Sequence, residues 1–128
     1  MSAAASDCMV ASTYLTRAER LLAQQAGRSV EGNRPNVARR LSVTVSACAD
    51  IRRRRRQSIP GWLKEKIISL FIEAAQAELR AIEHEILVAR QIGLGNSDGA
   101  LIAARARAAA LVDILDGINS EGAGAGAQ

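Results

Sequence analysis

Residues 59–92 are the stretch that most constrains how this chain can fold, because no proline or glycine interrupts them beyond the first turn. Pro60 has the φ angle of a first helical turn and no N–H group to leave unpaired. Gly93 follows the stretch, and glycine is common just past the end of a helix. The sequence therefore predicts one helix over residues 59–92, roughly 50 Å long at a rise of 1.5 Å per residue.

Two adjacent apolar rows run along this predicted helix. They consist of Leu63, Ile67, Leu70, Ala74, Ala77 and Ala81, and of Ile68, Ile72, Ala75, Leu79, Ile82 and Ile86. Steps of three and four residues mark one face of a helix, and two rows make a stripe wider than a coiled-coil seam. We expect Trp62 and Phe71 to join the core, and more than one neighbouring helix to cover the stripe.

Two further periodic segments predict helices at either end of the chain. The first should run to about Ala26, and the last should cover residues 99–116. Their expected N-caps are Asp7 or Ser12 for the first and Asn96 or Ser97 for the last, and glycines should end them at Gly27 and Gly117. Ser, Asp and Asn are preferred N-caps, and glycine is preferred after a helix. Asp98 should also favour the positive end of the last helix.

The region between the first helix and the long one is harder to interpret. Residues 28–36 read as a loop because they contain Gly, Asn and Pro. Residues 36–56 then place Val37, Leu41, Val45, Cys48 and Ile51 at helical spacing, which predicts one helix. Residues 41–47 also alternate between apolar and polar side chains as a strand would, but over a shorter distance, so we favour the helix.

Four helices with short connections indicate an all-α antiparallel four-helix bundle. We expect one domain over residues 1–118 and a flexible Gly/Ala-rich tail over residues 119–128. The long helix and the Ala-rich last helix offer more apolar surface than a small bundle needs. We therefore also expect a homo-oligomer, in the form of a closed ring.

Composition narrows the class of protein. The longest uncharged apolar run, residues 67–72, is too short to span a bilayer, and the N-terminus lacks the pattern of a signal peptide, so we expect a cytoplasmic protein with no membrane partner. Cys8 and Cys48 lack metal-ligand spacing and suit small buried thiols in a reducing compartment. His84, the only histidine, has no converging partners. We expect no enzyme activity, no cofactor and no metal site.

The positive charge of the chain is concentrated in one region. Residues 28–56 hold nine arginines against two acidic residues, a net charge of +7, so the remainder carries −3. On a helix, the arginines at positions 52–56 would encircle the axis, so the helix must either project from the core or unwind there. Such a cluster suits phosphate binding, and the candidate residues are Arg39, Arg40, Arg52, Arg53, Arg54, Arg55 and Arg56. The alternative is a solvated run paired with acidic residues of the long helix.

Two known DNA-binding motifs fit less well. The first helix and Gly27 resemble the start of a helix-turn-helix, but the stretch from Gly27 to Val37 is too long for its turn. A ribbon-helix-helix would use residues 41–45 as its strand, and the arginine run would then leave its next helix without an apolar face.

The chain resembles a known family in four places. VSACADI (45–51) is similar to V-S-I-P-A-N-I in the four-helix-bundle proteins encoded in 23S rRNA intervening sequences, and Arg39 and Arg40 stand where that family often has R-R. AELRAIEHEILVARQIGL (77–94) resembles its A-E-L-E-T-x-L-x-L-A-x-x-L-G-Y-L segment, and LVDILDGI (111–118) its closing R-M-L-x-G-L-I. Avd, the accessory variability determinant of diversity-generating retroelements, shares this fold.

The resemblance implies a non-enzymatic basic bundle that forms a ring, a homopentamer in members of the family. In retroelements, that ring binds a reverse transcriptase and its template RNA. The partners implied here are therefore RNA or an RNA–DNA hybrid, contacted through phosphate, and a reverse transcriptase. A different possibility is a protein-interaction bundle of the intervening-sequence type, in which the arginines bind no nucleic acid.

Overall fold

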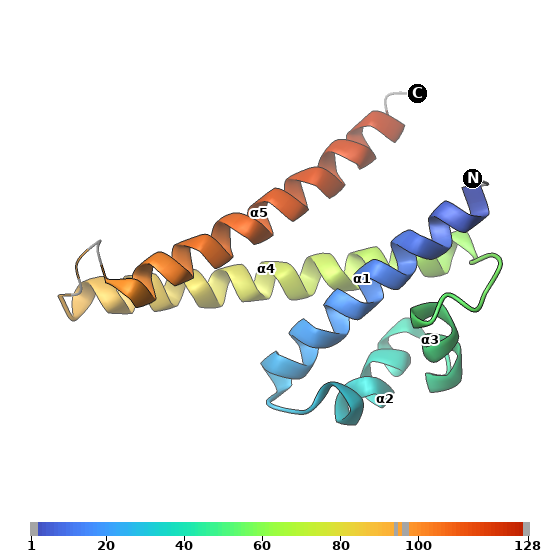
Figure 1. The fold of residues 1–128 in the computed structure, drawn as a ribbon, viewed down its shortest axis with the longest axis horizontal. Helices are drawn as coiled ribbons and strands as arrows, with labels where there is room; N and C mark the ends of the chain where they lie inside the picture. Colours follow the sequence, from blue (N-terminus) through green and yellow to red (C-terminus); the bar gives the residue numbers. More distant parts are fainter. Residues whose placement is uncertain (1–2, 94, 96–97, 127–128) are drawn as a thin grey trace. The chain divides into compact units, whose positions relative to one another are not determined.

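The computed structural model describes the backbone of residues 3–93, 95 and 98–126, and the side chains of residues 6–93, 95 and 98–119. The described chain contains five helices and no strand, which confirms the all-α class (Figure 1). The helices are α1 (Ala3–Ala26), α2 (Val30–Leu41), α3 (Val45–Arg52), α4 (Gly61–Gln91) and α5 (Gly99–Gly126). The expected number of four was wrong, while the antiparallel bundle order and the ring stay predictions.

The extra helix comes from residues 28–56, where the predicted loop and single helix were both wrong. Residues 30–41 form α2 with Pro35 inside it, and a three-residue turn separates α2 from α3. Helix α2 forms despite its Gly, Asn and Pro because the Ser29 side chain accepts a hydrogen bond from the Gly32 N–H and because α2 buries Asn33 and Val37. Residues 41–47 do not form a strand, because α2 ends at Leu41 and α3 begins at Val45. A ribbon-helix-helix needs that strand and is therefore excluded as well.

Helix α1 begins at Ala3, so neither Asp7 nor Ser12 is its N-cap. Both side chains instead contact other helices. The Asp7 carboxylate lies 2.8 Å from the ammonium of Lys64 at the start of α4. The helix ends as predicted, with Gly27 in the left-handed region at φ 66°.

Helix α4 confirms the predicted long helix to within two residues at each end. The Pro60 carbonyl accepts hydrogen bonds from Leu63 and Lys64, and Gly93 follows the helix at φ 87°. Phe71 is buried as expected and lies against Tyr14 of α1, with ring centroids 5.1 Å apart. The prediction for Trp62 was wrong, because its side chain is 54% exposed.

Helix α5 differs from its prediction at its C-terminal end. Its first turn is capped by Asp98, whose Oδ1 accepts hydrogen bonds from the N–H groups of Ala100 and Leu101. Asn96 and Ser97, the caps predicted from the sequence, lie outside the described residues. The helix continues through Gly117 to Gly126 instead of ending at Gly117. The flexibility expected for residues 119–128 stays a prediction.

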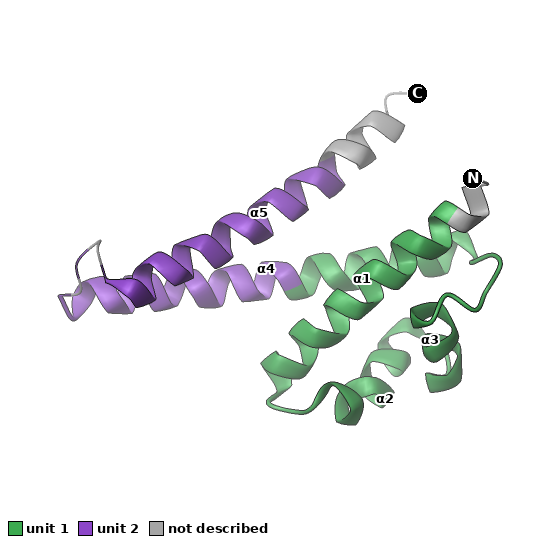
Figure 2. Cartoon of the chain, in the orientation of Figure 1, with its two compact units in different colours: residues 1–74 green, residues 75–128 purple. Residues whose placement is uncertain are grey.

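The chain divides into two compact units (Figure 2), residues 1–74 and residues 75–128. In the first unit, α1 packs against α2 and α3, and the Gln25 side chain donates a 2.9 Å hydrogen bond to the Ala74 carbonyl of α4. The single domain expected over residues 1–118 stays a prediction, because α4 runs unbroken through both units. None of the described helices combines the length and the apolar content that a membrane crossing requires.

Candidate nucleic-acid interface

The turn between α2 and α3 is closed by a left-handed residue. Ser42 lies at φ 60° and ψ 38°, and its N–H donates to the Arg39 carbonyl at 3.1 Å. The next N–H, that of Val43, donates to the Ala38 carbonyl at 3.1 Å. These two bonds form the Schellman motif that ends many helices. They stop α2 and turn the chain into α3 within three residues.

Helix α3 begins at once after this turn and is short. The Thr44 side chain is its N-cap and accepts a 3.0 Å hydrogen bond from the Ala47 N–H. Cys48 and Ile51 are buried, so α3 turns one face toward the core of the first unit and leaves the opposite face open. The buried face of α2, Val37, Ala38 and Leu41, is apolar as well.

The arginine run unwinds from α3 instead of continuing it. Arg54 has φ 58° and donates its N–H to the Ile51 carbonyl, and the Arg55 N–H donates to the Asp50 carbonyl at 2.9 Å. This is the same motif that ends α2. A positive φ is uncommon for a residue other than glycine, so Arg54 holds a strained position. Of the two options open from the sequence, unwinding is the one observed.

A buried carboxylate in α1 holds α2 and α3 together. Glu19 is 2% exposed and lies 3.4 Å from the guanidinium of Arg52 and 3.6 Å from Nε of Arg34. Burial raises the pKa of the Glu19 carboxyl, although the charges of Arg52 and Arg34 oppose the rise. The Ser12 hydroxyl donates a 2.9 Å hydrogen bond to the Arg52 carbonyl. Helix α1 therefore binds both the side chain and the backbone of the last residue of α3.

Cys48 lies close to the same cluster. Burial raises the pKa of its thiol, the charge of Glu19 raises it further, and Arg52 opposes the rise. Both Cys8 and Cys48 are free and buried, which confirms the expectation of small core thiols.

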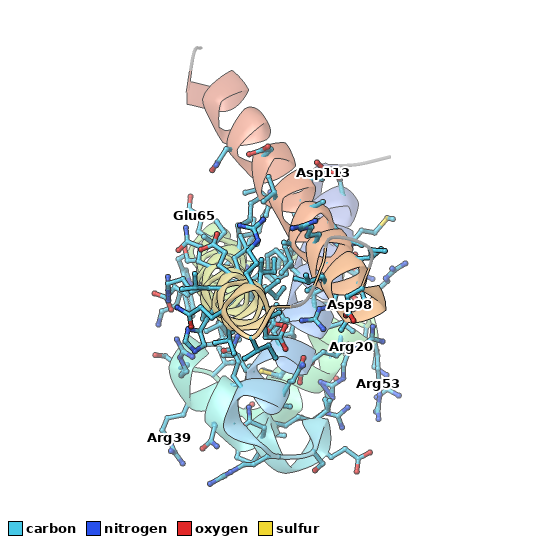
Figure 3. The ribbon with its side chains drawn as sticks, turned by 90° about the vertical axis from the view of Figure 1, so that its left-hand side faces the viewer. Arg20, Arg39, Arg53, Glu65, Asp98 and Asp113 are labelled. Atoms are coloured by element: carbon cyan, nitrogen blue, oxygen red, sulfur yellow. The ribbon has the colours of Figure 1, made fainter. Side chains whose placement is uncertain are left out.

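The structure separates the seven arginines predicted to bind nucleic acid. Arg52 turns inward to Glu19, and Arg40 lies 2.8 Å from the carboxylate of Glu73 on α4. Arg39 and the arginines at positions 53–56 are exposed. In Figure 3, the side chains of Arg39 and Arg53 extend from different sides of the molecule, so they do not form one continuous basic track.

Arg53 to Arg56 remain as the free part of the predicted cluster. Among the described side chains, these four arginines have no ion-pair partner within 4.0 Å. The alternative in which acidic residues of α4 neutralise the run therefore does not hold for them. Sequence reasoning missed Glu19 and Ser12, because nothing local in α1 indicates contacts to a residue more than thirty positions away.

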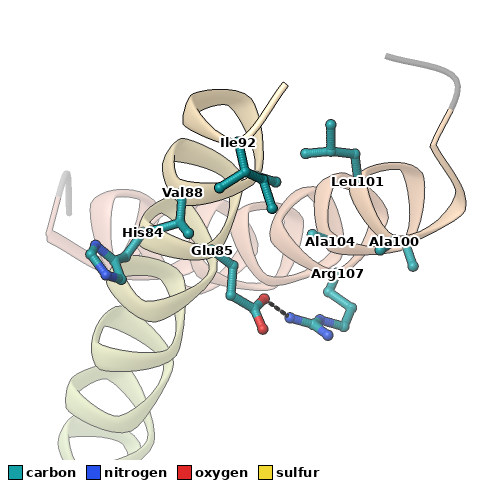
Figure 4. Close-up of a pocket in the computed structure, with 10 residues that line it drawn as sticks. His84, Glu85, Val88, Ile92, Ala100, Leu101, Ala104 and Arg107 are labelled. Atoms are coloured by element: carbon teal, nitrogen blue, oxygen red, sulfur yellow. Dashed lines mark hydrogen bonds and ion pairs between the residues drawn. The ribbon is translucent and has the colours of Figure 1, made fainter. Parts of the chain in front are cut away.

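The second unit contains a separate, mainly apolar pocket (Figure 4). It has a volume of about 550 Å³, and Val88, Ile92 and Leu101 contribute to its walls. Glu85 and Arg107 form an ion pair at one side. His84 also lines it and is exposed, and no group of three potential metal ligands occurs in the described part of the chain.

The chain matches no protein-family model, no curated protein and no solved structure. The resemblance to the intervening-sequence proteins and Avd therefore stays a prediction.

Proposed function

We propose that this protein binds double-stranded DNA through α2, the turn and α3, acting as a helix-turn-helix. The observation that carries the proposal is the arrangement of two short helices joined by three residues, with Ser42 in the left-handed region and an open face on α3. In a helix-turn-helix, the second helix enters the major groove and the first crosses the phosphate backbone. The sequence made this motif a less favoured alternative and placed its first helix and turn at α1 and Gly27, one helix earlier in the chain.

Charge supports this assignment. The four exposed arginines at positions 53–56 follow α3 directly, where they can reach the phosphates beside the groove that α3 would enter. Lys and Arg that neutralise phosphates release counterions, which gives a large, sequence-independent part of the affinity. Arg39 extends from a different side of the molecule and is not part of this contact. Arg52 has a different role, because it fixes α3 to Glu19.

A second candidate keeps the sequence-based expectation of a non-enzymatic, Avd-like accessory protein that holds RNA or an RNA–DNA hybrid beside a reverse transcriptase. The observation in its favour is the same unpaired arginine run, because phosphate contact alone needs no particular groove. The two candidates differ in what α3 does. A-form duplexes have a deep and narrow major groove that side chains cannot read, so α3 could not enter it.

The test compares one base sequence in three forms: duplex DNA, duplex RNA and an RNA–DNA hybrid, each followed by fluorescence anisotropy. The helix-turn-helix predicts the tightest binding to duplex DNA. Equal affinity for all three would favour the RNA-holding candidate. Binding to none of them would exclude both and favour a bundle that interacts only with proteins.

Salt dependence tests the arginine run by itself. Changing Arg55 and Arg56 to Gln should flatten the slope of log affinity against log salt by about 1.8, since each phosphate neutralised on a duplex contributes about 0.9. The control changes Arg80 and Arg90 to Gln, which removes two other exposed charges from the second half of α4. An equal effect of both pairs would show that net charge, and not the loop after α3, attracts the nucleic acid.

We also propose that the protein forms a homo-oligomer and that it is cytoplasmic. The support for the homo-oligomer is the apolar surface of the second unit, where Leu87, Ile92 and Ile102 are more than half exposed. Helix-turn-helix proteins commonly bind two half-sites as dimers, so association would raise DNA affinity. A pentameric ring is the finer form of this proposal, and the mass in solution tests both.

A further inference from the structure

We infer that α3 selects DNA by contact with thymine methyl groups, through Val45 and Ala49. This inference rests on the proposed DNA binding and names the sequence feature that the same site would read. It starts from what α3 contains. Between Thr44 and Ile51 there is no Arg, Lys, Asn or Gln. Those four residue types make the two-pronged hydrogen bonds by which proteins distinguish guanine and adenine in the major groove.

One edge of the open face of α3 instead presents methyl groups. Val45 is 44% exposed and Ala49 is half-buried, and the two lie four residues apart, on one side of the helix. At 100° per residue this side borders the buried Cys48, and Ser46 and Asp50 are the residues that lie opposite Cys48 and Ile51. In the major groove, the C5-methyl group of thymine is the apolar feature, and alanine and other small apolar groups contact it.

Hydrogen bonding from the same face is limited. The Thr44 side-chain oxygen already accepts the capping bond from Ala47. Ser46 is exposed, but a single hydroxyl bonds to several bases and so distinguishes them poorly. Asp50 can accept a hydrogen bond from cytosine, yet its negative charge opposes approach to phosphate. The face therefore suits base edges, while Arg53 to Arg56 beyond its end suit the phosphates.

The test first selects preferred duplexes from a randomised DNA pool with the whole protein. Each selected duplex is then made with deoxyuridine in place of thymidine, which removes the methyl group and keeps the base pair. We expect affinity to fall about fourfold for each thymine methyl group that the protein can no longer touch, the factor that corresponds to about 0.8 kcal/mol for one buried methylene.

A variant assigns the effect to α3. Val45→Ser should lower the affinity for the thymidine duplex. It should also bring the ratio of the affinities for the thymidine and deoxyuridine duplexes closer to one. The matched control is Val112→Ser in α5, an equally conservative change at a side chain that is 42% exposed, and it should leave the ratio unchanged. Because the measured quantity is the ratio of the two affinities, a variant that binds both duplexes more weakly to the same extent leaves it unchanged.

The outcomes separate the inference from the function beneath it. Selected duplexes that bind equally well with thymidine and deoxyuridine would overturn the methyl contacts and leave DNA binding intact. A pool that yields no preferred sequence would overturn the inference in the same way. Failure to bind any duplex would remove the proposed function and the inference together.

Discussion

The two units bury their apolar side chains to different degrees. Residues 1–74 enclose Phe71, Leu15 and Leu41 among four helical segments and add polar contacts such as the pair of Glu19 and Arg52. Among the described side chains of residues 75–128, only two large apolar ones are fully buried, Ile82 and Leu101, while five are exposed. The first unit therefore has a core of its own, whereas most of the large apolar side chains described in the second unit stay exposed or half-buried.

The largest expected difference between the units is in the cost of removing a leucine. Leu15→Ala in α1 should lower the free energy of unfolding by about 3 kcal/mol, because Leu15 is fully buried. Leu87→Ala in α4 should change it by less than about 0.5 kcal/mol, because Leu87 is 54% exposed. Urea unfolding followed by circular dichroism measures both. A large cost at Leu87 that grows with protein concentration would show that the second unit is covered by association.

The next effect concerns two neighbouring arginines of the first unit. Arg52→Gln should destabilise the fold by about 2 kcal/mol, because it leaves the buried Glu19 carboxylate with Arg34 alone. Arg53→Gln removes the same charge from an exposed residue and should change stability by less than about 0.5 kcal/mol. Thermal unfolding of both variants tests this. Equal stabilities would contradict the structural role assigned to Arg52.

Only part of the structure of the arginine run could be predicted from the sequence. The sequence showed that five arginines cannot share one solvated face, and it left open whether the helix projects from the core or unwinds; the chain unwinds after Arg52. The partner of Arg52 lies thirty-three residues earlier, and no local pattern in α1 marks Glu19 as its partner. A test that changes all five arginines at once would therefore mix loss of phosphate contact with loss of stability.

The helices could be predicted where the local sequence pattern determines them. They could not be predicted where contacts between distant residues determine where a helix begins or ends. Helix α4 followed from its length, its apolar rows and the glycine after it. The break between α2 and α3 was hidden because Val37, Leu41, Val45 and Cys48 keep helical spacing across it, and because Ser42 adopts a conformation usually held by glycine. The open face of α3 could be recognised as a candidate site only after that break was known.

A third comparison tests whether the second unit associates. Light scattering at tens of micromolar should return the mass of an oligomer. Ile92→Ser removes the most exposed large apolar side chain among the described residues, at 71%. The change should weaken association about tenfold, because burial of one such side chain contributes about 1.5 kcal/mol. The control is Trp62→Ser in the first unit, at 54% exposure. A monomer mass for the unchanged protein would exclude the oligomer.

The smallest expected effect is a pH dependence in the first unit. Because burial raises the pKa of Glu19, the folded protein holds a proton on this group at pH values where the unfolded chain has lost it. The free energy of unfolding should therefore fall as pH rises from the ordinary value of a glutamate to the raised one. In the Glu19→Gln variant, this fall of the free energy of unfolding with pH should be absent. Urea unfolding at a series of pH values measures it for both proteins. Parallel pH profiles for both proteins would contradict the raised pKa.

Helix α4 belongs to both units without a break, and this has a consequence for the order in which helices form. Starting a helix is unfavourable, since three residues must be fixed for one hydrogen bond, whereas adding to an existing helix is easy. The part of α4 in the first unit, residues 61–74, is anchored by Leu63, Ile67 and Phe71, so it can serve as the nucleus for residues 75–91. Residues 75–91 would then become helical by extension of a helix that has already formed in the first unit. The amide hydrogens of residues 75–91 should therefore exchange faster with solvent when the core of the first unit is weakened, even if the substitution lies in α1.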